Sequence, residues 1–332
     1  MSTKNKKKGA YSKIPQKSIF AKRIWLLEKL LNNDYTSEEL RNFWFKENEE
    51  EVCDKTISRW ADGAETDFEV DIDRPNKSNG KKYSLSRDSK GVILKNGSKK
   101  WIIASSLISD TIQKYQKTIN DKILMDDIPS AGKYLDEILE AISYKEEIKI
   151  TYKKYSGNGT PEEYIFHPYC VKLFENRWYV TGFCPKKKKV DDDGLRTFSL
   201  DQIQELTVNE DNKCDPIKFN EVFDAKAYFD KYFGIYTGVK DKTRLEIKIK
   251  VFGDRVRYFR ELPLHHTQKE INSVTGEDSY SIYQYDLIPA EDFYQALLHH
   301  GGHIEVLSPE SVRNKMKKKI QEMAEKYGMD IK

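Results

Sequence analysis

The sequence is poor in cysteine: only four occur among 332 residues, and no two of them form a CxxC pair. A zinc ribbon or a disulfide scaffold is therefore not expected, and free thiols in a reducing cytoplasm fit this usage best. The chain also lacks any run of about 18 apolar residues, which argues against a membrane-spanning helix. The lysines near its start have no apolar segment behind them, so we expect no secretory signal, no membrane partner and a cytoplasmic location.

Several motifs that mark common enzyme classes are missing as well. The chain contains no GxxxxGK(S/T), no GxGxxG, no HExxH and no GxSxG. No carboxylates are paired with the spacing of a metal site, and no nucleophile stands beside an evident base. We therefore expect a protein that is not an enzyme and that needs no cofactor and no metal.

The residues that are present indicate a folded chain of two or three domains. Apolar residues make up 38% and aromatics 12%, with 20 tyrosines, which is too apolar for a disordered chain and typical of half-buried strands. The net charge is only +3, but the charge is segregated along the chain. Residues 1–33 carry a net of +8, residues 34–73 a net of −10, and residues 74–90 a net of +5.

The first segment has the pattern of amphipathic helices. Ser18 precedes a stretch whose apolar residues recur at helical spacing, and this helix is expected to end at Asn32–Asp34. Thr36 and Glu39 then form a capping-box start for a second helix. Two consecutive helices are therefore predicted in front of the acidic stretch.

A third helix and a hairpin are predicted to follow. The helix is expected over residues 54–62 and ends at Gly63. Strands are expected over residues 68–72 and 82–85, joined by a polar and basic loop. Three helices and then a hairpin are the outline of a winged helix-turn-helix.

The rest of the chain changes its periodicity twice. Residues 91–139 have helical periodicity, whereas from about residue 144 short strands alternate with Gly, Asn and Asp turns, which predicts a small antiparallel barrel or a strongly bent sheet. Strands and helices then alternate to the end, which indicates a separate α+β domain. The predicted fold class is α+β and multi-domain, with a basic arm and winged helix-turn-helix at residues 1–88, a helical connector at 89–143, the barrel at 144–210 and a C-terminal α+β domain at 211–332.

Three segments of the barrel region resemble the WYL domain, namely FHPYCVK at residues 166–172, NRWYVTG at 176–182 and LRTFSLDQI at 195–203. The tripeptide that names this domain is Trp178-Tyr179-Val180 here, and Gln202 stands where the family commonly has arginine. Residues 257–268 and 301–310 are similar to the WYL C-terminal extension. Over nearly its whole length the chain resembles WYL-containing bacterial transcriptional regulators. The resemblance implies an SH3-like β-barrel for residues 144–208, a homodimer and ligand-gated control of transcription, sometimes in phage-defence loci.

The candidate DNA contacts lie on the third helix and on the hairpin. Arginine and lysine can reach guanine edges, while serine and threonine reach phosphates or bases. The alternative is that these side chains solvate a surface helix, and the acidic residues between 34 and 73 oppose tight docking. The basic arm and the hairpin loop offset that repulsion, so we expect binding of moderate affinity to a palindromic operator in double-stranded DNA. The candidates are Lys55, Thr56, Ser58, Arg59, Arg74, Lys77, Lys81 and Lys82.

The candidate effector contacts combine aromatic and basic side chains. Such a set suits a nucleotide or a single-stranded nucleic acid, through stacking and charge-assisted hydrogen bonds. The alternatives are that the barrel residues hold the barrel together and that the arginines form salt bridges with acids such as Glu261. The residues are Tyr152, His167, Tyr179 and Arg196 in the barrel, and Arg255, Arg257 and Arg260 in the extension.

The leading interpretation is a dimeric, ligand-responsive, DNA-binding transcriptional regulator. Two other classes remain open. One is an accessory protein whose WYL module modulates a partner enzyme without binding DNA. The other is a nucleic-acid-processing enzyme that uses the arginines and histidines of the extension.

Overall fold

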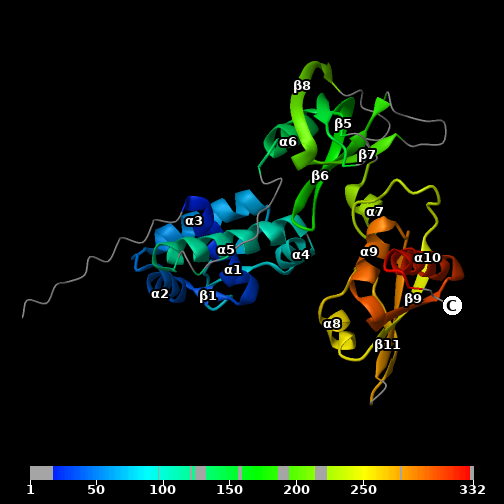
Figure 1. Cartoon of the computed structure of the whole chain (residues 1–332). Coiled ribbons are helices and arrows are strands. Elements are labelled where there is room, and N and C mark those ends of the chain that lie inside the picture. Colours follow the sequence, from blue (N-terminus) through cyan, green and yellow to red (C-terminus); the bar gives the residue numbers. More distant parts are fainter. Residues whose placement is uncertain are drawn as a thin grey trace, which may run out of the picture. The chain divides into compact units, whose positions relative to one another are not determined.

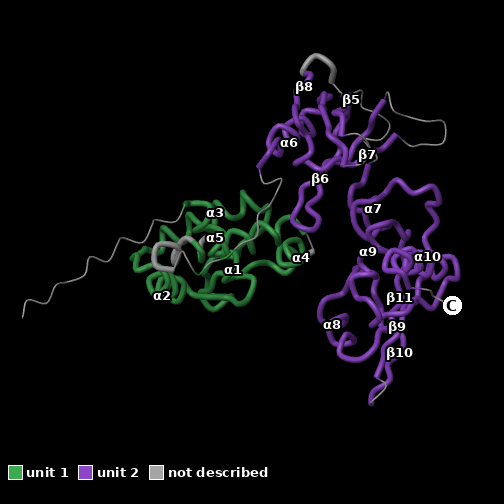
Figure 2. Tube along the Cα trace, in the orientation of Figure 1, with its two compact units in different colours: residues 1–126 green, residues 127–332 purple. Residues whose placement is uncertain are grey.

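The structure is a computed structural model that describes residues 18–95, 97–119, 122, 124, 132–155, 159–185, 194–213, 223–276 and 279–329. The chain divides into two compact units, residues 1–126 and residues 127–332 (Figure 2). The basic arm at residues 4–17 and the lysine run at 186–189 lie outside the described residues. No helix within the described ranges combines the length and apolar character needed to cross a bilayer.

Unit 1 consists of helices and a small antiparallel sheet. Its elements follow in the order α1 (Ile19–Asn32), β1 (Tyr35–Thr36), α2 (Ser37–Asn48), α3 (Asp54–Phe68), β2 (Ile72–Asp73), β3 (Lys82–Leu85), α4 (Arg87–Lys95) and α5 (Gly97–Ile119) (Figure 1). Strand β3 is central and pairs with both β1 and β2. The β2–β3 hairpin therefore closes through the loop of residues 74–81.

Local capping explains where the first two helices begin. The Ser18 hydroxyl accepts a hydrogen bond from the backbone N–H of Ala21, at 3.1 Å. Thr36 and Glu39 exchange hydrogen bonds in a capping box, which confirms the predicted start of α2. These contacts satisfy N–H groups that have no partner inside the helix.

Two predictions about the next elements are wrong. Helix α3 continues past Gly63 to Phe68, so the first hairpin strand begins only at Ile72. Gly63 lies inside the helix where a Cβ would collide with the guanidinium of Arg23, so this glycine leaves room for the Arg23 side chain of α1. The glycine is therefore not a helix stop, and its nearest neighbour is a side chain of another helix.

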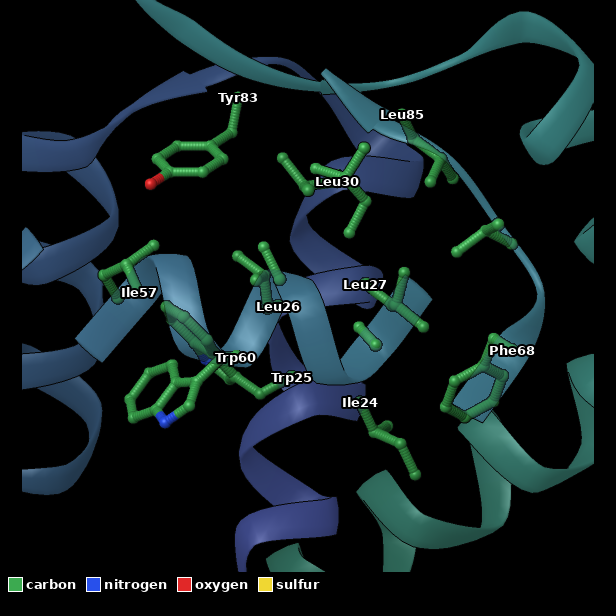
Figure 3. Packing of buried hydrophobic residues seen from close by; sticks show 14 of the residues in the cluster. Ile24, Trp25, Leu26, Leu27, Leu30, Ile57, Trp60, Phe68, Tyr83 and Leu85 are labelled. Carbon is green, nitrogen blue, oxygen red and sulfur yellow. The ribbon is translucent and has the colours of Figure 1, made fainter. Parts of the chain in front are cut away.

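Three tryptophans form the centre of the unit 1 core. Trp25 meets Trp44 and Trp60 edge to face, with ring centroids 5.0 and 6.1 Å apart. The indole N–H of Trp25 donates to Glu47 at 2.7 Å, and that of Trp44 donates to Glu50 at 3.1 Å. Figure 3 shows Trp25 and Trp60 among the aliphatic side chains of α1. Two residues of the acidic stretch are therefore acceptors for buried indoles.

The predicted helical connector is divided between the two units. Ile93 of α4 and Ile103 of α5 are buried in the tryptophan core of unit 1. Helix α6 (Leu135–Tyr144) instead packs on the first sheet of unit 2, where Ile138 is fully buried.

The first sheet of unit 2 contains β4 (Glu146–Tyr152), β5 (Glu162–Phe174), β6 (Arg177–Phe183), β7 (Leu195–Ser199) and β8 (Ile203–Lys213), in the antiparallel order β7-β6-β5-β4-β8. The first half of β5 pairs with β4 and the second half with β6, and the register with β6 shifts between Pro168 and Cys170. Proline lacks the N–H that a ladder needs, so an irregularity here is expected. The sequence pattern predicted a small antiparallel barrel or a strongly bent sheet, and the resemblance implied an SH3-like barrel. The described strands form an open sheet whose end strands β7 and β8 do not pair with each other, so the closed barrel is wrong.

A second sheet follows a short helix, α7 (Ala225–Phe229). It contains β9 (Leu245–Phe252), β10 (Lys269–Val274), β11 (Tyr280–Leu287) and β12 (Ile304–Ser308) in the order β10-β11-β9-β12, and the chain adds α8 (Arg255–Glu261), α9 (Glu291–His299) and α10 (Glu310–Lys326). Phe293 of α9 and Met316 of α10 are buried with the sheet residues. The α+β class predicted for the chain is confirmed.

Candidate functional site

The exposed side of α3 carries two of the predicted DNA contacts. Lys55 and Arg59 are exposed and lie four residues apart, so they project from the same face of the helix. Neither side chain forms a hydrogen bond or ion pair with another described residue. Thr56 and Ser58 are half-buried, and the Thr56 hydroxyl lies 3.4 Å from the Cys53 Sγ. The helix thus presents two cations to solvent.

Two asparagines shape the loop between β2 and β3. Asn76 Oδ1 accepts hydrogen bonds from two backbone N–H groups of the loop, at 2.8 and 3.0 Å. Asn79 Nδ2 donates to the carbonyls of Arg74 and Lys82, at 2.8 and 2.9 Å. Side-chain amides therefore hold a turn that has few backbone pairs. The lysines predicted to contact DNA are exposed or half-buried on this loop and at the start of β3, namely Lys77, Lys81 and Lys82.

Arg74 has a different environment from these lysines. Its guanidinium pairs with Asp62 at 2.6 Å and with Glu65 at 2.7 Å, and it donates to the carbonyl of Ile72 at 2.6 Å. Partial burial opposes the charge of Arg74, but the hydrogen bonds to the two carboxylates outweigh it and raise its pKa. Arg74 therefore connects the hairpin to α3, and the structure does not group it with the solvent-facing cations.

Many of the acidic residues between 34 and 73 are paired with cations from other elements. Lys29 contacts Glu47 at 2.8 Å, and Arg41 contacts Asp54, the neighbour of Lys55, at 3.0 Å. Pairing lowers the negative potential that a phosphate would meet at this surface. Further ion pairs are Lys22–Glu50, Arg23–Asp67 and Lys99–Glu69.

Unit 2 contains a cleft of about 980 Å³ between its first sheet and the segment that follows α7. Its described lining includes four basic side chains and five tyrosines and no carboxylate. Tyrosine rings provide faces for stacking, and cations attract an anion. These residues are Arg177, Arg196, Lys240 and Lys242, with Tyr152, Tyr155, Tyr179, Tyr228 and Tyr236.

Three of the four effector contacts predicted in the first sheet meet in this cleft. The Tyr152 hydroxyl lies 3.2 Å from the Ser199 hydroxyl. The Arg196 guanidinium donates to the carbonyl of Leu195 at 2.7 Å. Burial raises the pKa of Tyr179, so its phenol stays protonated and can donate a hydrogen bond. The structure therefore brings Tyr152, Tyr179 and Arg196 to one site.

His167, the fourth, is turned inward. It is only 7% exposed, does not line the cleft, and its Nε2 lies 2.9 Å from a carboxylate oxygen of Glu147. Its Nδ1 is buried and has no hydrogen-bond partner among the described residues. The geometry gives His167 a structural environment beside β4.

An arginine that the sequence analysis did not select organises one end of the cleft. Arg177 donates to the Asp201 carboxylate at 2.5 Å and to the hydroxyl of Tyr155, which in turn donates to the same carboxylate at 3.1 Å. Burial disfavours the charged carboxylate, but the hydrogen bonds from Arg177, Gln202 and Tyr155 outweigh it and lower the pKa of Asp201. The network fixes the position of the Tyr155 ring.

The three arginines predicted in the extension do not line the cleft. Arg257 pairs with Glu261 at 2.8 Å, as the salt-bridge alternative proposed. Arg260 pairs with Glu270 at 2.5 Å, and its hydrogen bonds hold the pKa of that carboxyl at about 2. Arg255 lies against the ring of Tyr258, with its guanidinium carbon 5.6 Å from the ring centroid. Within the described ranges, no group of three or more His, Cys, Asp or Glu could hold a metal ion.

The sequence analysis missed the wall of the cleft that follows α7. Tyr236, Lys240 and Lys242 come from a segment without regular periodicity. Its signal was the sequence YTGVKDK at residues 236–242, in which an aromatic residue precedes two lysines. Loops that carry aromatic and basic residues between regular elements are common binding segments.

Comparison with known families and structures gives the following. Among solved structures, the chain is similar to proteasome accessory factor B/C (PafBC) of Arthrobacter aurescens, with 16% identity and a TM-score of 0.37 over 95% of this chain and 48% of that chain. It is also similar to a CRISPR Cas-related protein, with 14% identity and a TM-score of 0.39 over 96% of this chain and 88% of that chain. This chain thus spans about half the length of the first structure.

The search of curated proteins finds no match. Residues 133–208 match the WYL domain family, and residues 243–324 match the WCX domain family. Strands β4 to β8 fall almost entirely within the first match, and β9 to β12 lie within the second. The chain therefore carries a WYL domain followed by a WCX domain.

Proposed function

We propose that the protein is a DNA-binding transcriptional regulator, without enzymatic activity, whose cleft in unit 2 binds a nucleotide or a short single-stranded nucleic acid. The observation that carries the proposal is the cleft itself, because it combines several tyrosine faces with cationic side chains and has no carboxylate in its described lining. A WYL domain contributes one side of this cleft.

The DNA-binding part of the proposal is supported by unit 1. Its order α1, β1, α2, α3, β2, β3, with β3 central in the sheet, supports the winged helix-turn-helix that the proposal places here. In this arrangement α3 is the recognition helix, Lys55 and Arg59 contact base edges, and the lysines of the ordered loop contact phosphates.

The proposal includes a homodimer. A palindromic operator has two half-sites related by a twofold axis, and a dimer matches that symmetry. Trp101 and Ile108 are exposed seven residues apart on α5, so they share one face of this helix. This face is our candidate for the dimer contact.

The DNA-binding part can be tested with an operator selected from random double-stranded DNA. The variant Lys55→Ala/Arg59→Ala should lose about 1–3 kcal/mol of discrimination per lost base contact. The variant Lys81→Ala/Lys82→Ala should bind all sequences more weakly. It should also reduce the salt slope, which is the slope of log affinity against log salt concentration, by about one per lysine.

A matched control removes two exposed lysines elsewhere, in Lys46→Ala/Lys100→Ala, and should change neither quantity. If the Lys55/Arg59 variant prefers the selected operator as strongly as the wild type does, α3 is not the recognition helix. An accessory protein that modulates a partner enzyme would select no operator at all.

The effector part can be tested on Arg196, which lines the cleft. Arg196→Ala should leave the melting temperature and basal operator binding intact but abolish the response to an added oligonucleotide. Arg257→Ala removes an equal charge outside the cleft and is the control. A large fall in melting temperature for Arg196→Ala, with DNA binding lost in parallel, would show that Arg196 is structural.

A further inference from the structure

One wall of the cleft is held by contacts that the proposed function does not use. We call residues 232–242 the strap. The strap follows α7, leads towards β9, and contributes Tyr236, Lys240 and Lys242 to the cleft. Through the backbone of residues 234–236, the strap contacts a buried carboxylate of the WCX domain and an amine of the WYL domain.

The carboxylate is that of Asp292 on α9, which is only 5% exposed. Its Oδ2 accepts hydrogen bonds from the backbone N–H groups of Ile235, at 2.8 Å, and Tyr236, at 3.1 Å. Its Oδ1 accepts one from the N–H of Phe293, at 2.9 Å. A buried carboxylate is costly unless it is hydrogen-bonded, and two of these three donors belong to the strap.

The amine is that of Lys172 on β5. It donates to the carbonyl of Gly234 at 2.7 Å and lies 4.2 Å from the centroid of the Phe229 ring. In the ladder between β5 and β6, Lys172 is directly opposite Tyr179, which lines the cleft. Directly opposite residues project from the same face of a sheet, so Lys172 holds the strap next to this tyrosine.

Gly234 allows the strap to pass between these groups. A Cβ at this position would lie 2.5 Å from Asp292 Oδ2 and 2.5 Å from the ring of Phe174 at the end of β5. The strap is thus confined between the two domains of unit 2 at Gly234, and it lines the cleft from the next residue, Ile235, onwards. We call Lys172, Gly234 and Asp292 the clamp.

We propose that Asp292 is a positioning residue that places Lys240 and Lys242 of the strap against the phosphates of an oligonucleotide in the cleft, and thereby couples occupancy of the cleft to the WCX domain. The inference rests on the proposed function, since it assigns the phosphate-binding wall of the same cleft. It also explains why an acid of the WCX domain is buried against a segment outside that domain.

The test uses the full chain, a fluorescein-labelled short oligothymidylate as the probe, and the variant Asp292→Asn. Asparagine keeps the shape of the side chain and one acceptor oxygen but loses the charge. We expect hydrogen exchange at the amides of Ile235 and Tyr236 to become faster and probe binding to weaken about tenfold. The control is Glu291→Gln, which neutralises the neighbouring carboxylate that pairs with Lys319 and not with the strap.

The salt dependence of probe binding separates positioning from simple damage to the fold. Each phosphate contact on single strands contributes about 0.7 to the slope of log affinity against log salt concentration, so losing two lysine contacts should lower the slope by about 1.4. A variant that merely unfolds a fraction of the molecules keeps the slope. Lys240→Ala/Lys242→Ala should lower the slope equally, and adding Asp292→Asn to it should have little further effect.

The exchange rates, the salt slope and probe binding by the wild type each test a different part of the proposal. Unchanged exchange at Ile235 and Tyr236 would show that Asp292 does not hold the strap. Weaker probe binding at an unchanged salt slope would show that Asp292 is structural only. If the wild type binds no probe, the proposed function and the coupling both fail, whereas the exchange experiment still decides whether the clamp positions the strap.

Discussion

Breaking the Arg177–Asp201 pair at the end of the cleft should destabilise the WYL domain by an amount that can be estimated. The side chains of Arg177 and Asp201 are 28% and 11% exposed, so the pair is neither fully buried nor on the surface. Removing one partner of a buried pair costs about 3–5 kcal/mol, and exposed pairs contribute about 0–1 kcal/mol. We therefore expect Asp201→Asn and Arg177→Met each to lower the free energy of unfolding by about 2 kcal/mol.

The double variant should lose about as much as either single variant, because no unpaired charge then remains in the site. The resulting coupling free energy of about 2 kcal/mol has a defined pH dependence. The folded-state pKa of Asp201 is lowered, so its contribution is fully present above the unfolded value of about 3.9 and is lost as the pH falls through the folded value. The coupling measured near pH 7 should therefore decrease in acid.

Fluorine NMR of protein labelled with 5-fluorotryptophan can follow this unfolding in urea. Trp178 is the single one of the five tryptophans that lies beyond residue 126, so its resonance reports on unit 2. If the two single effects add, so that the double variant loses about 4 kcal/mol, Arg177 and Asp201 are not coupled and the description of this network is wrong.

Three further predictions concern other parts of the chain. Arg74→Ala should destabilise unit 1 by about 1 kcal/mol in urea unfolding, since it removes the contact with Asp62. It should leave the salt slope of DNA binding unchanged, and a lower slope would show that Arg74 contacts phosphate. Thr36→Ala should cost about 1 kcal/mol through loss of the capping box, and an unchanged urea midpoint would refute this. Burial and the neighbouring His266 lower the pKa of His265 to about 4, so thermal stability of unit 2 should fall between about pH 6.5 and pH 4, where only the unfolded chain takes up the proton. His265→Gln should weaken that dependence, and a curve equal to the wild type would contradict the assignment.

Local signals allowed parts of the fold to be predicted. The capping box at Thr36 and the strand pattern of residues 82–85 depend on neighbours in sequence, and both α2 and β3 occur where they were expected. In strand β10 all side chains are exposed, so no alternation of buried apolar residues marks it in the sequence. Gly63 was misread because its reason lies in the side chain of Arg23, far away in sequence.

The candidate cleft was predicted only in part, for a similar reason. Tyr152, Tyr179 and Arg196 lie within the segment that resembles a WYL domain, and alternation along strands places them on one site. His167 lies in the same segment, but Glu147 on the adjacent strand draws it inward. The strap has no periodicity, and only the fold brings it to the cleft. Contacts across more than about ten residues are outside what a pattern in one sequence can predict.

The loop that Asn76 and Asn79 hold together affects how unit 1 would meet a charged partner. A loop that is already hydrogen-bonded has little conformational entropy left to lose, so Lys77 and Lys81 would act as pre-organised charges. A flexible loop would lose conformational entropy when it becomes ordered on binding, and this loop avoids most of that cost. More of the binding free energy therefore stabilises the complex. Pre-organised charges also attract an oppositely charged surface before contact, so this loop would contribute to the rate of association as well as to its strength.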